Sequence, residues 1–130
     1  MKANGETNRT VVRWHDEHTL EFVYRGDVTA AEMGRVLAEY RRLRAGRPER
    51  FQIVDVEAMN WLDPGSSEVV FELLRDFAAG GGREVVVIVT EANARMRALS
   101  LGFRAQVPAR VFATRAAALA RLASLAGRAD

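Results

Sequence analysis

The sequence predicts an α/β fold: a single domain over residues 1–130 with a mixed central β-sheet of about five strands and about four helices. Two observations predict this class. Short β-branched or aromatic runs alternate with longer segments whose apolar residues fall at helical spacing, and glycine or proline separates most of them. The resulting order, ββαβαβαβα, implies right-handed helical crossovers after an initial hairpin. A chain of 130 residues can bury such a core.

An antiparallel hairpin is expected near the N-terminus. Thr10–Trp14 (TVVRW) and Thr19–Tyr24 (TLEFVY) are short runs of apolar, β-branched or aromatic residues, and the polar residues His15–His18 (HDEH) separate them. Two such runs around a polar turn are typical of paired neighbouring strands.

The first helix begins at a capping box from Thr29 to Glu32, in which the hydroxyl and the carboxylate each satisfy a free backbone N–H. Gly46 and Pro48 end it. Its apolar stripe is predicted to comprise Met33, Val36, Leu37, Tyr40 and Leu43.

The rest of the chain alternates strand and helix. The continuous β-branched run Glu84–Thr90 (EVVVIVT) indicates a central strand covered on both faces. Gly80–Gly82 follows a helix and precedes this strand, so we interpret it as a helix end and turn. The other predicted elements are strand Phe51–Val56, helix Ser66–Phe77, helix Ala92–Leu101 ended by Gly102, strand Arg110–Ala113 and helix Thr114–Leu125.

Composition narrows the class of protein. Hydrophobic residues make up 48% and charged residues 28%, which argues against disorder. No apolar run approaches the roughly 20 residues of a membrane span, and the N-terminal MKANGETNRT has no signal-peptide core, so a cytoplasmic location is expected. The absence of cysteine excludes disulfides and thiolate metal sites.

Arginine supplies 18 of the 19 basic residues, but formal net charge is only +2. Such a skew fits phosphate recognition or the coding bias of a GC-rich genome, and the even spread along the chain favours the second. The densest run is Arg41, Arg42, Arg44, Arg47 and Arg50, where Tyr40 is the one nearby aromatic residue. We interpret this run as a solvated helix end and expect no nucleic-acid partner.

Candidate catalytic and metal-binding residues are few. The HDEH residues His15–His18 would not converge in a turn, and no third ligand is evident, so no metal or other cofactor is expected. Ser66 and Ser67 lack the flanking pattern of a nucleophile elbow, and the candidate bases lie in a different element. The sequence therefore predicts a protein that is not an enzyme.

The stretch NWLDPGSSEVVFELL contains the most informative local motif. Asp63 followed by Pro64 is a strong helix start, because the carboxylate caps free N–H groups and proline's fixed φ suits the first helical position. Gly65, Ser66 and Ser67 would fill the first turn with small residues. An open helix N-terminus presents backbone donors to a partner or an anion.

From Ile53 to Leu99 the chain resembles the STAS domain, the fold of anti-sigma-factor antagonists and of sulfate-transporter tails. The shared pattern is a strand ending in an acidic residue, a second aspartate that opens a small-residue turn into a helix, a glycine turn and an apolar strand. Asp55 and Asp63 match the two acidic positions, LGFRAQVPARVFATRAAALARL matches the tail, and the resemblance covers about residues 8–125. It implies a bacterial regulatory module that binds another protein, such as a kinase-type anti-sigma factor or another signalling protein.

The chain departs from the family at the phosphorylated serine. That serine is the second residue after the loop aspartate, and here Gly65 occupies the position. Ser66 could take the role only through a register shift, so loss of the phosphoserine switch is favoured. The expected partner-binding surface is Asp63, Pro64, Gly65, Ser66 and Ser67. Two alternatives stay open: a small anionic or apolar ligand at this helix start or in an inter-helix pocket, and a homodimer.

Overall fold

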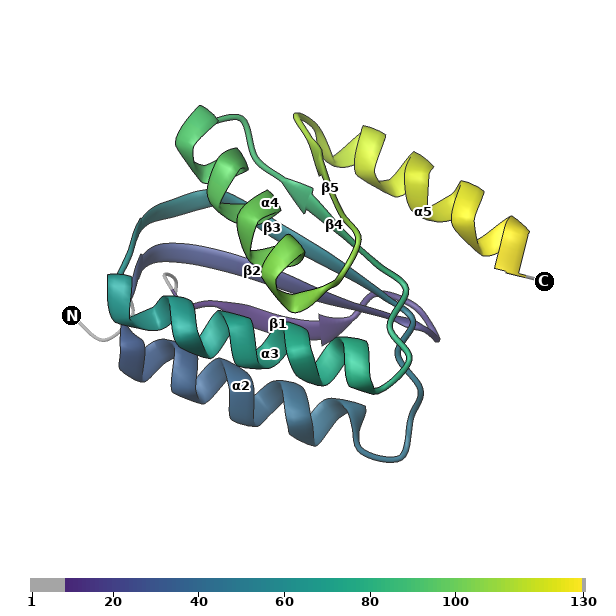
Figure 1. Ribbon diagram of the computed structural model, residues 1–130, viewed down its shortest axis with the longest axis horizontal. Helices are drawn as coiled ribbons and strands as arrows, with labels where there is room; N and C mark the ends of the chain where they lie inside the picture. The colour runs from purple at the N-terminus through teal and green to yellow at the C-terminus, as the bar shows by residue number, and fades with distance from the viewer. Residues whose placement is uncertain (1–8, 130) are drawn as a thin grey trace.

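The structure, a computed structural model, describes residues 9–129 (Figure 1). Its element order confirms the predicted ββαβαβαβα arrangement. The elements are β1 (Val11–Trp14), β2 (Thr19–Val28), α2 (Ala30–Arg44), β3 (Phe51–Leu62), a 3-10 turn (Pro64–Ser66), α3 (Ser67–Ala79), β4 (Glu84–Ile88), α4 (Ala92–Ala105), β5 (Ala109–Phe112) and α5 (Arg115–Ala129).

Five strands form one mixed sheet in the order β1-β2-β3-β4-β5. β1 pairs antiparallel with β2, and the other neighbours are parallel. Each parallel strand lies next to the one that precedes it in the chain, so every right-handed crossover places its helix on the same face. Helices α2, α3 and α4 therefore cover one face, and α5, which follows the last strand, covers part of the other (Figure 1).

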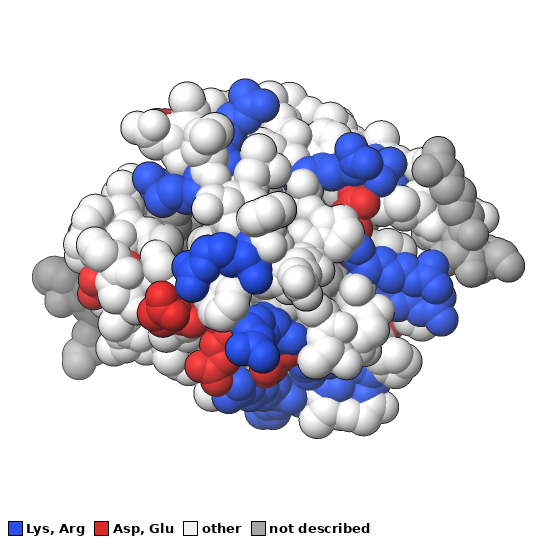
Figure 2. Space-filling view, in the orientation of Figure 1, with Lys and Arg blue, Asp and Glu red and all other residues white. Residues whose placement is uncertain are grey.

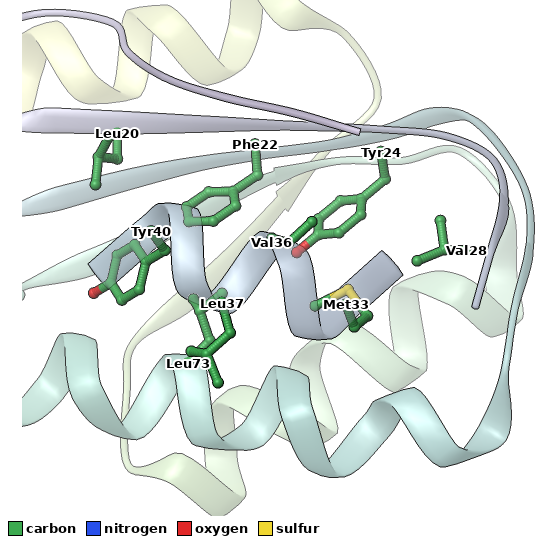
Figure 3. Packing of buried hydrophobic residues seen from close by; sticks show 9 residues of the cluster. All are labelled: Leu20, Phe22, Tyr24, Val28, Met33, Val36, Leu37, Tyr40 and Leu73. Atoms are coloured by element: carbon green, nitrogen blue, oxygen red, sulfur yellow. The ribbon is translucent and has the colours of Figure 1, made fainter. Parts of the chain in front are cut away.

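The largest buried cluster lies between β2 and α2. Alternate residues of β2 point toward α2, because successive side chains of a strand point to opposite faces of the sheet. One stripe of α2 packs against them, because residues three or four apart lie on the same side of a helix. Figure 3 shows the packing, and the predicted stripe is confirmed. The fully buried or nearly buried members are Leu20, Phe22, Tyr24, Val28, Met33, Val36, Leu37, Tyr40 and, from α3, Leu73.

β2 and β3 extend further than predicted. β2 continues to Val28 and β3 to Leu62, so the predicted ends at Tyr24 and Val56 are wrong. Their pairing contains two register shifts, and Gly26 lies at one of them with a φ of 62°. A bulge keeps two strands paired while it breaks the apolar alternation that a sequence pattern relies on.

Gly102 does not end α4. The helix continues to Ala105, and Gln106 closes it in the left-handed conformation with a φ of 59°. A Cβ on Gly102 would lie 2.8 Å from the Cβ of Ala109. The predicted end is wrong because this glycine serves close packing of α4 against β5.

Candidate functional site

The helix start predicted at Asp63 is present. Pro64–Ser66 forms a 3-10 turn that leads into α3, and Asp63 is its N-cap. The Asp63 Oδ1 accepts a hydrogen bond from the backbone N–H of Gly65 at 3.0 Å. Pro64 occupies the first position, where its fixed φ is favourable. The structure therefore gives Asp63 and Pro64 the local roles that the sequence indicates.

Ser66 is buried, so the expectation that it lies at an open helix mouth is wrong. Its exposed fraction is 0%, and its hydroxyl has no hydrogen-bond partner within residues 9–129. The tight turn leaves Pro64 and Gly65 exposed and Ser67 half-buried. A partner or a kinase cannot reach the Ser66 hydroxyl in this conformation.

Asp55 lies apart from Asp63, on the sheet face that α5 covers. Its Oδ2 is 3.7 Å from Nη1 of Arg115, the first residue of α5. Arg115 also pairs with the buried Glu21. Burial alone would raise the pKa of Glu21, but hydrogen bonds from Arg115 and Arg13 outweigh it and lower the pKa. The two acidic residues that match the family do not form one site.

The arginine run after the α2 stripe is engaged within the protein. Arg41 Nε lies 2.7 Å from Oδ2 of Asp76, and its Nη2 lies 2.7 Å from Oε2 of Glu72, both on α3. Arg44 donates to the backbone carbonyl of Asp76. These contacts join the ends of α2 and α3, which fits a structural role better than a nucleic-acid surface.

The histidines lie far from the helix start. His15 and His18 belong to the turn that precedes β2, whereas Ser66 follows the end of β3, which runs parallel to β2. Within residues 9–129, no group of three or more His, Asp or Glu side chains is arranged to hold a metal ion. Nor does any helix in this described part combine the length and hydropathy that crossing a membrane requires.

A cavity of about 100 Å³ lies between the sheet and helices α3 and α4. β4 ends at Ile88, opposite Asp55, while β3 runs on to Leu62 without a strand on that side. The cavity walls are mainly apolar. On the α4 side they consist largely of small residues, Ala94, Ala98 and Gly102, which leave space that larger side chains would fill.

Within residues 9–129, four large apolar side chains are exposed, and they come from the two segments that flank this cavity. Trp61, near the end of β3, is 49% exposed. On α4, Met96, Leu99 and Phe103 are 69%, 42% and 86% exposed. Their spacing places all three on one side of the helix. We call Trp61, Met96, Leu99 and Phe103 the exposed apolar surface.

Sequence reasoning missed this surface, although a signal was present. Helix α4 carries two apolar stripes, with small residues at 94, 98 and 102 and large ones at 96, 99 and 103. The helix contains three arginines in its exposed part and no acidic residue. Figure 2 shows basic side chains bordering uncharged atoms on this face, with acidic side chains gathered mainly over α3.

Neither known protein-family models nor curated proteins give a match to the chain. Solved structures do. An uncharacterised protein of the DUF3478 family with a SpoIIAA-like fold, from Shewanella loihica PV-4, shares 16% identity at a TM-score of 0.69 over 87% of this chain and 91% of its own. The unphosphorylated anti-sigma factor antagonist SpoIIAA shares 16% identity at a TM-score of 0.69, over 87% and 96%.

The phosphorylated form of SpoIIAA, a Bacillus cell fate determinant, gives 15% identity and a TM-score of 0.66, over 87% of this chain and 98% of its own. This chain therefore has an α/β fold of the SpoIIAA-like kind. This confirms the resemblance of the sequence to the STAS fold. At such low identity the likeness establishes the fold alone.

Proposed function

We propose that the protein is a non-enzymatic regulatory module of the bacterial cytoplasm that acts by binding another protein. The exposed apolar surface carries this proposal. Three of its side chains, Met96, Leu99 and Phe103, share one side of α4, and monomeric proteins rarely expose large apolar side chains together without an interaction to explain them. Tryptophan, as at Trp61, is enriched among the residues that dominate binding energy. The fold supports the proposal, since one protein that shares it is named as an anti-sigma factor antagonist.

The binding surface that we propose joins the helix start to the exposed apolar surface. Trp61 lies two residues before Asp63, and the exposed Pro64 and Gly65 follow directly. Ser67 is half-buried at the beginning of α3. These residues present an aromatic side chain beside small ones, a combination into which a partner's side chain can pack closely. Ser66 contributes to the fold of the turn and not to its surface.

The arrangement of polar residues supports a module without catalysis. The Ser66 hydroxyl is buried and has no base as a hydrogen-bond partner within residues 9–129, and both histidines lie at the opposite end of the parallel strands. A nucleophile needs a base within about 3 Å. No such pair involves Ser66 in the described chain.

We also propose that this module lacks the phosphoserine switch of its structural relatives. Gly65 stands where the resemblance places the phosphoacceptor, and burial withholds Ser66 from a kinase. The partner that fits best is a kinase-type anti-sigma factor or another signalling protein whose binding is controlled by other means. Self-association through the same surface is the alternative that the test separates.

Substitution at Gly65 tests the proposal without disturbing the core. A Cβ there would meet only Oδ1 of Asp63 at 3.6 Å, so Gly65→Gln should fold normally. Gly34→Gln on α2 is the matched control, since nothing lies within 4 Å of its Cβ. The wild-type chain and both variants serve as baits in cell extract from the source organism, with captured proteins quantified by mass spectrometry.

We expect Gly65→Gln and Trp61→Ala each to lose a protein that wild type and Gly34→Gln retain. A captured set that is the same for all four baits would contradict the proposal. Light scattering on the purified wild type distinguishes the alternative, because a dimer that Trp61→Ala converts to monomer would assign this surface to self-association.

A further inference from the structure

We propose that the cavity between the sheet, α3 and α4 binds a small aliphatic carboxylate that carries a hydroxyl group at the far end of its chain. This ligand site is separate from the proposed protein-binding role and does not rest on it. A buried amide, from Gln52, and an exposed guanidinium, from Arg97, line this cavity.

The buried amide is that of Gln52, which lines the cavity from β3. The residue is fully buried, and neither its Oε1 nor its Nε2 makes a hydrogen bond within residues 9–129. Its amide lies near the Glu49 carboxyl, whose Oε2 also lacks a partner within residues 9–129, but no hydrogen bond of normal length and angle joins the two. A buried polar group without a partner is costly, so a ligand hydroxyl that pairs with Gln52 would remove a penalty.

The guanidinium belongs to Arg97, which lines the cavity from α4 and is exposed to solvent. It forms no ion pair within 4.0 Å in the described chain. The Glu91 carboxylate interacts with Arg97 only through its charge. The Glu91 oxygens already accept hydrogen bonds from the backbone N–H groups of Asn93 and Ala94. Arg97 is therefore available to hold a ligand carboxylate beside an apolar cavity.

The two polar groups lie at different places along α4. Gln52 is opposite Val85 in the sheet, Val85 is opposite Ala109, and Gly102 packs on Ala109, so Gln52 is near the Gly102 end of the cavity. Arg97 precedes Gly102 by five residues (102 − 97), or roughly 7.5 Å along the helix axis, and Gln52 lies two strands across the sheet from Ala109. A saturated chain of about six carbons covers the axial component of this separation.

The size and polarity of the cavity fit this ligand better than water. An apolar cavity of about 150 Å³ can hold benzene, so about 100 Å³ can hold part of an alkyl chain. An ordered internal water needs about two to four polar partners, whereas nearly all of the residues that line this cavity are apolar, with Tyr24, Gln52 and Arg97 as the exceptions.

Titration of the purified protein, followed by amide chemical shifts, tests the proposal with three probes: 6-hydroxyhexanoate, hexanoate without the hydroxyl, and 1,6-hexanediol without the carboxylate. We expect wild type to bind 6-hydroxyhexanoate about 3- to 10-fold more tightly than hexanoate. The diol should bind about 2- to 5-fold more weakly than 6-hydroxyhexanoate, because the pairing with Arg97 is partly solvent-exposed.

Three variants assign the contacts. Gln52→Leu should remove the preference for the hydroxyl while hexanoate still binds, which also shows that the cavity is intact. Arg97→Gln should remove the preference for the carboxylate. Arg95→Gln, an exposed arginine on the same helix that does not line the cavity, should change neither.

Several results would overturn the assignment. They are a lack of saturable binding by all three probes, equal affinity of wild type for 6-hydroxyhexanoate and hexanoate, and shifts outside the cavity that Gln52→Leu and Arg97→Gln leave unchanged.

Discussion

Helices α2 and α4 cover the same face of the sheet and use their apolar residues in opposite ways. In α2 the large side chains, such as Met33 and Tyr40, face the sheet and are fully buried. In α4 the side facing the sheet carries small residues such as Ala98, and the large side chains of Met96 and Phe103 point to solvent. Helix α2 buries its large apolar side chains in the core, whereas α4 leaves its large apolar side chains exposed to solvent, where a partner could contact them.

This difference separates stability from binding within one small domain. The β2–α2 half holds large residues at close packing, where truncation leaves a cavity. The α4 side already contains a cavity, and its outward apolar residues add little to the core. We expect substitutions in the first region to unfold the protein and substitutions in the second to change what it binds.

The largest expected effect is at Phe22. Its side chain is fully buried. The centroid of its ring lies 5.6 Å from that of Tyr40 and 6.3 Å from that of Tyr24. Phe22→Ala should lower the free energy of unfolding by about 3–5 kcal/mol. Urea denaturation measures the change, and a loss below about 1 kcal/mol would show that this half is not the stabilising core.

The stability of the protein is expected to depend on pH through the buried carboxyl of Glu49, which contacts Tyr40 of α2. Burial raises its pKa to about 7, although the Tyr40 hydroxyl, which donates to Oε1 at 2.7 Å, acts in the opposite direction. An unfolded glutamate loses its proton near its ordinary value of 4.5, whereas the folded protein keeps it to about 7. The folded state binds more protons between these values, so stability should fall as pH rises from about 4.5 to about 7.

Glu49→Gln keeps an acceptor for Tyr40 and removes the titration. Its stability should be nearly flat from pH 5 to pH 8, whereas that of wild type should fall by on the order of 1–3 kcal/mol over the same range. Thermal unfolding at several pH values compares the two. Parallel curves for the variant and wild type would show that Glu49 ionises normally in the folded protein.

A smaller effect is expected at the helix start between the two regions. Asp63→Ala removes the acceptor for the Gly65 N–H and should cost about 1 kcal/mol. Asp63→Asn keeps an acceptor oxygen and should cost less, which makes it the matched control. Equal melting temperatures for Asp63→Ala and wild type would show that the cap contributes nothing to α3.

The smallest effect on stability is expected at Phe103, which is 86% exposed. Phe103→Ser should change the free energy of unfolding by less than about 0.5 kcal/mol. Measured beside Phe22→Ala, this variant sharpens the comparison, because both remove a phenylalanine ring. A loss of 2 kcal/mol or more would mean that Phe103 packs against the fold and that α4 has no free apolar face.

Much of the fold could be predicted because its signals are periodic. The alternation of Leu20, Phe22 and Tyr24 and the stripe through Val36 and Tyr40 report burial directly. The Asp63 cap was predictable for a different reason, since its contact is formed within three residues of sequence. The extra length of β2 and β3 was not, because bulges carry no periodic signal.

The candidate site was harder to predict because it depends on contacts between distant segments. Ser66 is small and polar, and its burial follows from how the 3-10 turn sits on the core. Asp55 matches an acidic position of the family, but its ion pair with Arg115 could not be predicted, because the two residues are 60 positions apart in the sequence (115 − 55). Beside the two apolar stripes of α4, a second signal was Gln52, a polar residue in an otherwise apolar strand start that is nevertheless fully buried.

We assign partner binding to α4 and the helix start, and stability to the β2–α2 half. Hydrogen–deuterium exchange on the complex with the captured partner separates these two roles. We predict slower exchange on binding in residues 59–67 and 92–105, with little change in α2 and α5. Protection confined to α5 or to the β1 edge, with α4 unchanged, would contradict the account.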